Sequence, residues 1–178
     1  MFKHSILCAL TGTILTAAPS FAENVEIYLI DMLDNKQAGY CVDIAGGKGE
    51  SADPADGLQG HTCYSPGGAL GFDQVFDTAR FADGQLYMTN FDVCAEISSA
   101  SAGSSVGLAK CDGGATQSFT FSGSGTITPN AAPELCLTVG EATRSGRSAV
   151  NQIKVMSLET CSADQAAYQT WGVRSSLN

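Results

Sequence analysis

The sequence predicts an all-β domain built from three similar units. Short segments rich in β-branched and aromatic residues, such as VEIYLI (25–30) and QLYM (85–88), are separated by clusters of Gly, Ser, Asn, Asp and Pro. No stretch keeps a helical period for long, although 162–169 could form one helical turn. The triplet Gln-x-aromatic occurs three times, at 74–76, 117–119 and 169–171.

Aligning the chain on these triplets shows that each unit repeats one pattern. A Cys is followed two residues later by an acidic or polar residue and then by an aliphatic one. A Gly/Ser-rich loop, an apolar stretch ending in a second Cys, and the triplet complete the unit. The first Cys segments are YCVDI (40–44), VCAEI (93–97) and LCLTV (135–139), and the second are LQGHTC (58–63), VGLAKC (106–111) and MSLETC (156–161). We place the repeats at about 23–81, 82–122 and 123–178.

The cysteines fit the same repeat. Of the seven cysteines, Cys8 lies in an N-terminal apolar run, and spacing alone does not choose a pairing for the other six. The repeat predicts one disulfide per unit, namely Cys41–Cys63, Cys94–Cys111 and Cys136–Cys161. A zinc site is the alternative. It is disfavoured because no CxxC spacing is present and His61 is the only histidine after the N-terminal segment.

The N-terminal segment is typical of a secretory signal peptide. Residues 1–22 contain a short basic start, an apolar run and a small-x-small ending at Ala22. We expect cleavage after Ala22, a single domain over 23–178, and a secreted or periplasmic location. The apolar run is too short to cross a bilayer, so no membrane span is expected.

The charge of the chain excludes some partners. With 18 acidic and 9 basic residues, the formal net charge is −9. Such a surface repels phosphate backbones and anionic membranes, so we expect no nucleic acid partner.

With three such units, the chain resembles the ricin B-type lectin family, also known as family 13 carbohydrate-binding modules. The resemblance implies a β-trefoil, in which three units with pseudo-threefold symmetry form a barrel capped by hairpins. Two of the three triplets depart from the family pattern because they end in Phe rather than Trp. In this fold Phe76, Phe119 and Trp171 are expected to fill the core where the units meet. The Gln amides are expected to satisfy backbone groups at a bend.

The resemblance also implies that each unit can form a shallow sugar pocket. A carboxylate there accepts hydrogen bonds from sugar hydroxyls, an amide donates and accepts, and an aromatic ring stacks on the sugar. The first unit fills every position of this pocket, with Asp43, Gln59, His61, Asp73 and Gln74. The other two units are incomplete: the second has Glu96, but Gly107 and Ala109 replace the Gln and the aromatic, and the third has Thr138, Ser157 and Glu159. We therefore predict one sugar site, in the first repeat.

Other interpretations of the same residues remain. Asp43 could bond a nearby turn, and Gln59 could be an ordinary strand residue. The acidic loop at 47–57 could hold calcium, but it has no EF-hand pattern and a solvated loop is favoured. We expect no metal and no cofactor. Catalysis is disfavoured because His61 is the only candidate histidine base and no GxSxG motif is present, although carboxylates suited to glycosidase chemistry are plentiful.

We therefore expect a non-enzymatic protein that binds carbohydrate or glycan. The alternative is an interaction module that binds another protein through the trefoil surface. Because Asp43 and Asp73 should lie near His61, we also expect the pKa of His61 to lie at or above its ordinary value.

Overall fold

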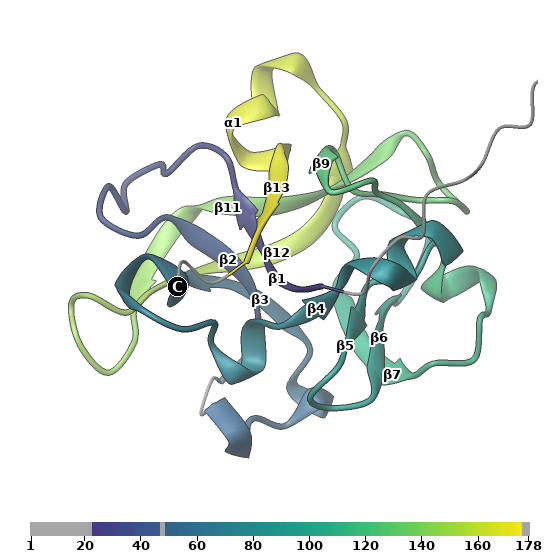
Figure 1. The fold of residues 1–178 in the computed structure, drawn as a ribbon. Helices are drawn as coiled ribbons and strands as arrows, with labels where there is room; N and C mark the ends of the chain where they lie inside the picture. Colours follow the sequence, from purple (N-terminus) through teal and green to yellow (C-terminus); the bar gives the residue numbers. More distant parts are fainter. Residues whose placement is uncertain (1–22, 47–48, 176–178) are drawn as a thin grey trace, which may run out of the picture.

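The computed structural model describes residues 23–46 and 49–175, so the predicted signal peptide at 1–22 lies outside the described residues. The described chain is almost entirely β-structure (Figure 1). Its strands are β1 (Asn24–Leu29), β2 (Tyr40–Ile44), β3 (Leu58–Thr62), β4 (Phe76–Asp77), β5 (Tyr87–Met88), β6 (Val93–Ile97), β7 (Val106–Lys110), β8 (Phe119–Thr120), β9 (Ser124–Gly125), β10 (Thr128–Pro129), β11 (Leu135–Ser145), β12 (Gln152–Thr160) and β13 (Trp171–Arg174).

The helical elements are short. One α-helical turn, α1 (Ala166–Gln169), lies in the segment predicted to hold a turn of helix. The 3-10 turns are Gly49–Ser51, Pro54–Asp56, Ser65–Gly67, Phe72–Gln74, Thr78–Asp83, Ala115–Gln117 and Ala163–Gln165. In the described residues, no helix is long and apolar enough to cross a membrane.

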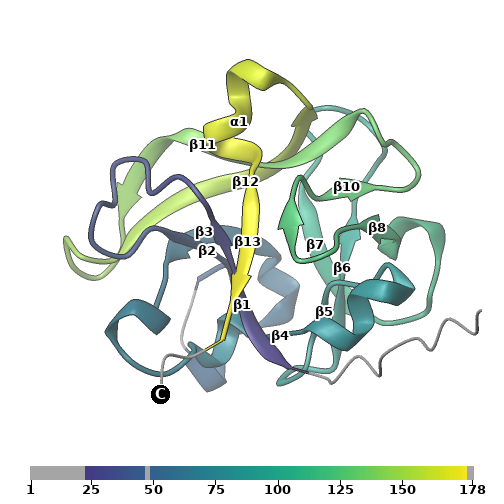
Figure 2. The same ribbon diagram turned by 45° about the horizontal axis from the view of Figure 1, so that its top comes forward.

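The strands form three sheets. The largest has the order β11-β12-β3-β2-β1-β13-β9, with β4 also paired to β1. The second repeat contributes the three-stranded sheet β5-β6-β7, and β8 pairs with β10. The sheet β5-β6-β7 lies on one side of the molecule, and the tip of the β11–β12 hairpin projects from the other side (Figures 1 and 2).

Strand register confirms the alignment of the repeats. In each unit the residue two after the first Cys faces the residue four before the second Cys. These pairs are Asp43 and Gln59 in the first repeat, Glu96 and Gly107 in the second, and Thr138 and Ser157 in the third. Each repeat holds one disulfide, as predicted: Cys41–Cys63, Cys94–Cys111 and Cys136–Cys161.

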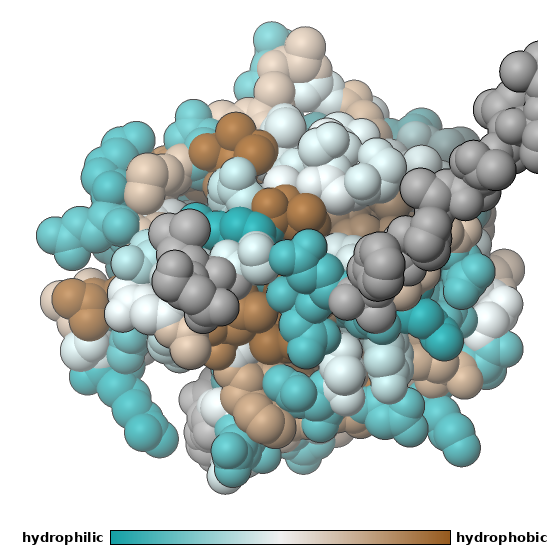
Figure 3. All heavy atoms as spheres, in the orientation of Figure 1, coloured by the Kyte–Doolittle hydropathy of each residue, from teal (hydrophilic) through white to brown (hydrophobic). Residues whose placement is uncertain are grey.

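The aromatic residues of the triplets lie in the core. Phe76 and Trp171 have no exposed surface and Phe119 has 2%. The indole N–H of Trp171 donates to the carbonyl of Leu137 at 2.9 Å, so its polar atom is satisfied inside an apolar cluster. The hydrophobic side chains still exposed form separate patches on the face shown in Figure 3.

The Gln of each triplet holds its own repeat together. Nε2 of Gln74 donates to Oδ2 of Asp43 at 2.9 Å and to the Thr62 carbonyl at 3.1 Å. Its Oε1 accepts the backbone N–H of Tyr64 at 3.3 Å. One amide therefore ties the residue two after the first Cys to the backbone on both sides of the second Cys.

The same arrangement recurs in the other repeats. Nε2 of Gln117 donates to Oε2 of Glu96 at 3.1 Å, and Nε2 of Gln169 donates to Oγ1 of Thr138 at 3.0 Å. Both amides also bridge the backbone around the second Cys. The role expected for these amides is confirmed. We call each Gln side chain with its three hydrogen bonds a Gln clamp.

The third repeat differs from the short strands expected because its hairpin is long. A bulge between Val139 and Thr143 bends β11, and β12 pairs with β3 of the first repeat. Gly60 makes this contact possible, because a Cβ there would lie 2.8 Å from Cγ1 of Val139. The hairpin thereby covers one face of the first repeat.

Candidate functional site

The structure brings together all five residues predicted for the sugar site. Strands β2 and β3 place Asp43 opposite Gln59, and the amide of Gln59 donates to Oδ1 of Asp43 at 2.8 Å. The 3-10 turn Phe72–Gln74 then brings Asp73 and Gln74 to the same place, where Gln74 donates to the second oxygen of Asp43.

The group is more deeply buried than a shallow pocket would require. Asp43 and Gln74 have no exposed surface, Asp73 has 1%, and Gln59 and His61 have 4% and 6%. Only Gln59 and His61 line the pocket described next, while Asp43 and Gln74 lie behind them. Both oxygens of Asp43 already accept hydrogen bonds from these amides.

A pocket of about 580 Å³ lies above this group. Its walls come from two repeats, because β3 and the residues around it form one side and the tip of the β11–β12 hairpin forms the other. The described lining residues are Gly46, Gly49, Gln59, His61, Tyr64, Arg144, Ser145, Gly146, Arg147, Asn151 and Ile153.

Tyr64 and the whole hairpin side of this pocket were not predicted from the sequence. Tyr64 follows Cys63 directly, so an aromatic residue beside the second Cys was a usable signal. Arg144 and Arg147 lie in the third repeat, and an alignment that treats each repeat as a separate unit does not place them over the first.

Tyr64 supplies an aromatic wall. It is 40% exposed, and its ring centroid lies 5.6 Å from that of His61 with the planes tilted by 37°. Tyr64 also borders a neighbouring notch of about 300 Å³, lined with Leu70, Phe72 and Asp73. A sugar ring could therefore pack its C–H face on the Tyr64 ring from either side.

The carboxyl group of Asp43 is neutral at pH 7. Burial, and then the negative charge of Asp73, raise its pKa to about 8, although hydrogen bonds from Gln59 and Gln74 act in the opposite direction. Below that pH the group holds its proton. It therefore acts as part of a neutral hydrogen-bonded network.

The expectation of an ordinary or raised pKa for His61 is wrong. Burial lowers the pKa of His61, and the nearby Arg144 lowers it further, against the effects of Thr62 and Asp73. The expectation counted the nearby carboxylates and left out burial of the ring, which is the largest effect. Nδ1 of His61 lies 3.0 Å from the Thr62 carbonyl and donates to it in the neutral ring, which leaves Nε2 as an acceptor.

Asp73 carries an unsatisfied buried oxygen. Its Oδ2 accepts the backbone N–H of Gly49 at 2.9 Å. Its Oδ1 is buried and has no hydrogen-bond donor within the described residues. A buried acceptor without a donor costs about 1–3 kcal/mol. A ligand hydroxyl reaching this oxygen would remove that cost.

The equivalent positions of the other repeats cannot form this arrangement. In the second repeat Gly107 and Ala109 offer no polar or aromatic side chain toward Glu96. In the third, Oγ1 of Thr138 donates to the Cys136 carbonyl and the Ser157 hydroxyl donates to Glu159.

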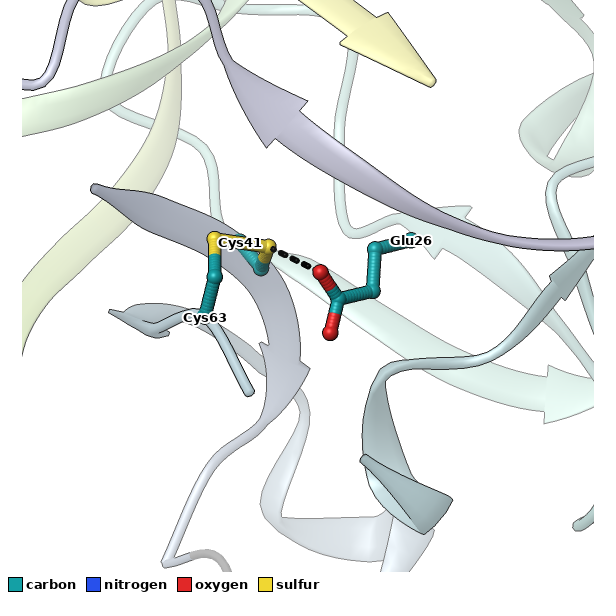
Figure 4. A group of neighbouring side chains, drawn as sticks. All are labelled: Glu26, Cys41 and Cys63. Carbon is teal, nitrogen blue, oxygen red and sulfur yellow. Dashed lines mark hydrogen bonds between the residues drawn. A yellow bond between two sulfur atoms is a disulfide. The ribbon is translucent and has the colours of Figure 1, made fainter. Parts of the chain in front are cut away.

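One further cluster combines a carboxylate with two cysteines. Glu26 is fully buried, and its Oε2 lies 3.3 Å from Sγ of Cys41 (Figure 4). The two sulfur atoms are joined in the Cys41–Cys63 disulfide, so they offer no thiolate to a metal. The Glu26 carboxylate instead accepts from Ser65 and forms a salt bridge of 3.2 Å with Arg174.

Comparison with known proteins places residues 82–177 in a described family. This segment matches the ricin-type beta-trefoil lectin domain, and it spans the second and third repeats. No curated protein matches the sequence significantly.

Several solved structures share the fold. The agglutinin from Abrus precatorius superposes with a TM-score of 0.61 at 14% identity, covering 90% of this chain and 51% of its own. A non-toxic homologue of type II RIPs from Momordica charantia, in complex with α-methyl-D-galactoside, gives 0.55 at 21% identity, covering 85% and 47%. The β-trefoil lectin of the Vibrio vulnificus hemolysin/cytolysin, with N-acetyl-D-lactosamine bound, gives 0.52 at 13% identity, covering 89% and 98%. The chain thus spans about half the length of the two plant proteins.

Proposed function

Because this chain belongs to the ricin-type beta-trefoil lectin domain family, we propose that it binds carbohydrate without catalysis, through the pocket between its first repeat and the β11–β12 hairpin. Gln59 and His61 contact the sugar directly, and Tyr64 supports one face of its ring. Asp43 and Gln74 hold Gln59 in place through the two amide bonds to the buried carboxyl group.

The observation that carries this proposal is the lining of that pocket, where the polar groups of Gln59 and His61 lie beside the aromatic ring of Tyr64. A sugar offers hydroxyl donors next to an apolar C–H face, and this combination suits both groups. The equivalent positions of the other repeats lack the opposing amide, so we assign them no site.

The same proposal includes export from the cell. Three disulfides are typical of an oxidising compartment, and the 1–22 segment has the sequence of a signal peptide. N-terminal sequencing of exported protein should begin at Glu23.

A protein-binding role is the second candidate. Val150 and Val155 on the long hairpin are 65% and 71% exposed, which favours a contact surface there. Binding of a protein with no measurable glycan affinity would support this role in place of the first.

Calorimetric titration against sugars selected on a glycan array tests the proposed site. A single shallow site should bind a monosaccharide weakly, with a Kd near ~1 mM. Gln59→Ala and His61→Ala should each weaken binding. The matched control is Glu96→Gln, which changes the equivalent clamp residue of the second repeat. If Gln59→Ala and His61→Ala both leave binding unchanged, the site lies elsewhere.

A further inference from the structure

The pocket has a charge opposite to that of the chain as a whole. The protein carries 18 acidic and 9 basic residues. Among its described lining residues, however, the pocket has Arg144 and Arg147 and no aspartate or glutamate. The local surface that a bound sugar would meet is therefore cationic.

Within the part of the chain that the structure describes, neither arginine forms a salt bridge of the kind found for other basic residues. Arg174 forms a salt bridge with the buried Glu26 at 3.2 Å, and Lys154 forms one with Asp34 at 3.4 Å. In residues 23–46 and 49–175, no carboxylate lies within salt-bridge distance of Arg144. Its positive charge is thus available to a ligand.

The guanidinium of Arg144 is nevertheless held in place. It donates to Oε1 of Gln59 at 3.3 Å, and Gln59 is fixed in turn by its 2.8 Å bond to Asp43. An arginine has five N–H donors, so most of them stay free. The planar fork of the guanidinium matches the two oxygens of a carboxylate or a sulfate.

The hairpin that carries Arg144 is also fixed. Lys154 is 2% exposed and donates to the carbonyl of Glu141 and to Oγ1 of Thr143, each at 2.7 Å. These bonds hold the bulged part of β11 directly before Arg144. The cationic side of the pocket therefore needs little ordering when a ligand binds.

The acidic groups nearest the pocket do not cancel this charge. Asp43 has no exposed surface and is protonated at neutral pH because its pKa is about 8. Asp73 does not line this pocket but lines the neighbouring notch beside Tyr64, and its Oδ2 accepts the backbone N–H of Gly49. His61, with its lowered pKa, is neutral and adds no charge.

We propose that this pocket selects sugars that carry an anionic group, a carboxylate or a sulfate, and that Arg144 binds this group while the ring packs on Tyr64 and His61. This inference rests on the proposed function. Arg147, on the same hairpin tip, adds a second positive charge. Because the net charge of −9 repels long polyanions, the ligand is a single residue or a short oligosaccharide.

Three ligands with one ring and different C6 substituents test the proposal: galactose, galacturonic acid and galactose 6-sulfate. In calorimetric titrations at low ionic strength, we expect at least one anionic sugar to bind about tenfold more tightly than galactose. The difference should shrink at about 0.5 M salt. Arg144→Gln should remove it, so that the anionic sugar binds no more tightly than galactose. Lys110→Gln removes an exposed charge of the second repeat and is the matched control.

Each result decides a separate point. Preference for galacturonic acid alone, or for the sulfate alone, supports the proposal and identifies the anionic group. Equal binding of all three sugars overturns the selectivity and leaves the proposed function standing. A preference that survives in the Arg144→Gln, Arg147→Gln double variant overturns the assignment to the hairpin. Binding of no glycan of any kind, on the array or in titration, overturns the proposed function itself.

Discussion

The first and second repeats have the same strand register and the same Gln clamp, but they differ at the residue that the clamp holds. Asp43 has no exposed surface, faces Gln59 and lies behind a pocket. Glu96 occupies the same register position, faces Gly107 and is half-buried. The clamp is therefore a folding device common to the repeats, and the pocket depends on two additions: the amide opposite the acid and the hairpin of the third repeat.

The largest expected effect comes from the core that both repeats share. Trp171→Ala should lower the free energy of unfolding by ~3–5 kcal/mol, as truncation of large buried aromatics does. Phe119→Ala, at the equivalent place in the second repeat, should cost a similar amount because this ring is also in the core. Denaturant unfolding followed by circular dichroism measures both. A Trp171→Ala midpoint equal to that of the wild type would contradict the role given to this residue.

The next effect separates the two clamps. Gln117→Ala should cost ~1–2 kcal/mol, because the backbone groups it frees lie near solvent. Gln74→Ala should cost more, ~2–3 kcal/mol, because it also leaves an oxygen of the buried Asp43 without a donor. Both values come from the same unfolding assay. Equal costs would show that burial of Asp43 adds nothing to the first clamp.

A smaller, pH-dependent effect belongs to the first repeat alone. The pKa of Asp43 rises from 3.8 to about 8 on folding, so the folded state keeps a proton that the unfolded state releases. Its contribution to stability is therefore fully present below about pH 4 and declines as the pH rises toward 8. For each pH unit between about 5 and 7, the free energy of unfolding of the wild type should fall by ~1.4 kcal/mol relative to that of Asp43→Asn.

Denaturant midpoints at several pH values test whether the stability of the wild type falls, relative to Asp43→Asn, as the pH rises. Asp34 does not confuse the result, since its pKa is lowered to about 2 and it titrates below the window. Glu96→Gln, at the equivalent position of the second repeat, is the matched control. If the midpoints of Asp43→Asn change with pH in the same way as those of the wild type, Asp43 is ionised in the folded protein.

The sequence predicted what is repeated and missed what joins one repeat to another. The disulfides, the core aromatics and the Gln clamps follow from a local pattern that occurs three times, so they could be predicted. The positions of Arg144 and Lys154 follow from the length and bulge of one hairpin, which has no counterpart in the other repeats. The pKa of His61 was mispredicted because burial of the ring lowers it more than any neighbouring group raises it, and Arg144 of the third repeat lowers it further. No local sequence pattern reports that burial.

The most direct test of a single site in the first repeat uses the three clamp amides as reporters. The side-chain NH₂ groups of Gln74, Gln117 and Gln169 occupy equivalent positions and give separate signals in a ¹⁵N-correlated NMR spectrum. During titration with a sugar found on the array, the signals of Gln74 and of the nearby Gln59 should shift together with saturation. Those of Gln117 and Gln169 should stay in place. Shifts at Gln117 or Gln169, or shifts at none of these amides while the sugar binds, would contradict a single site beside the Gln clamp of the first repeat.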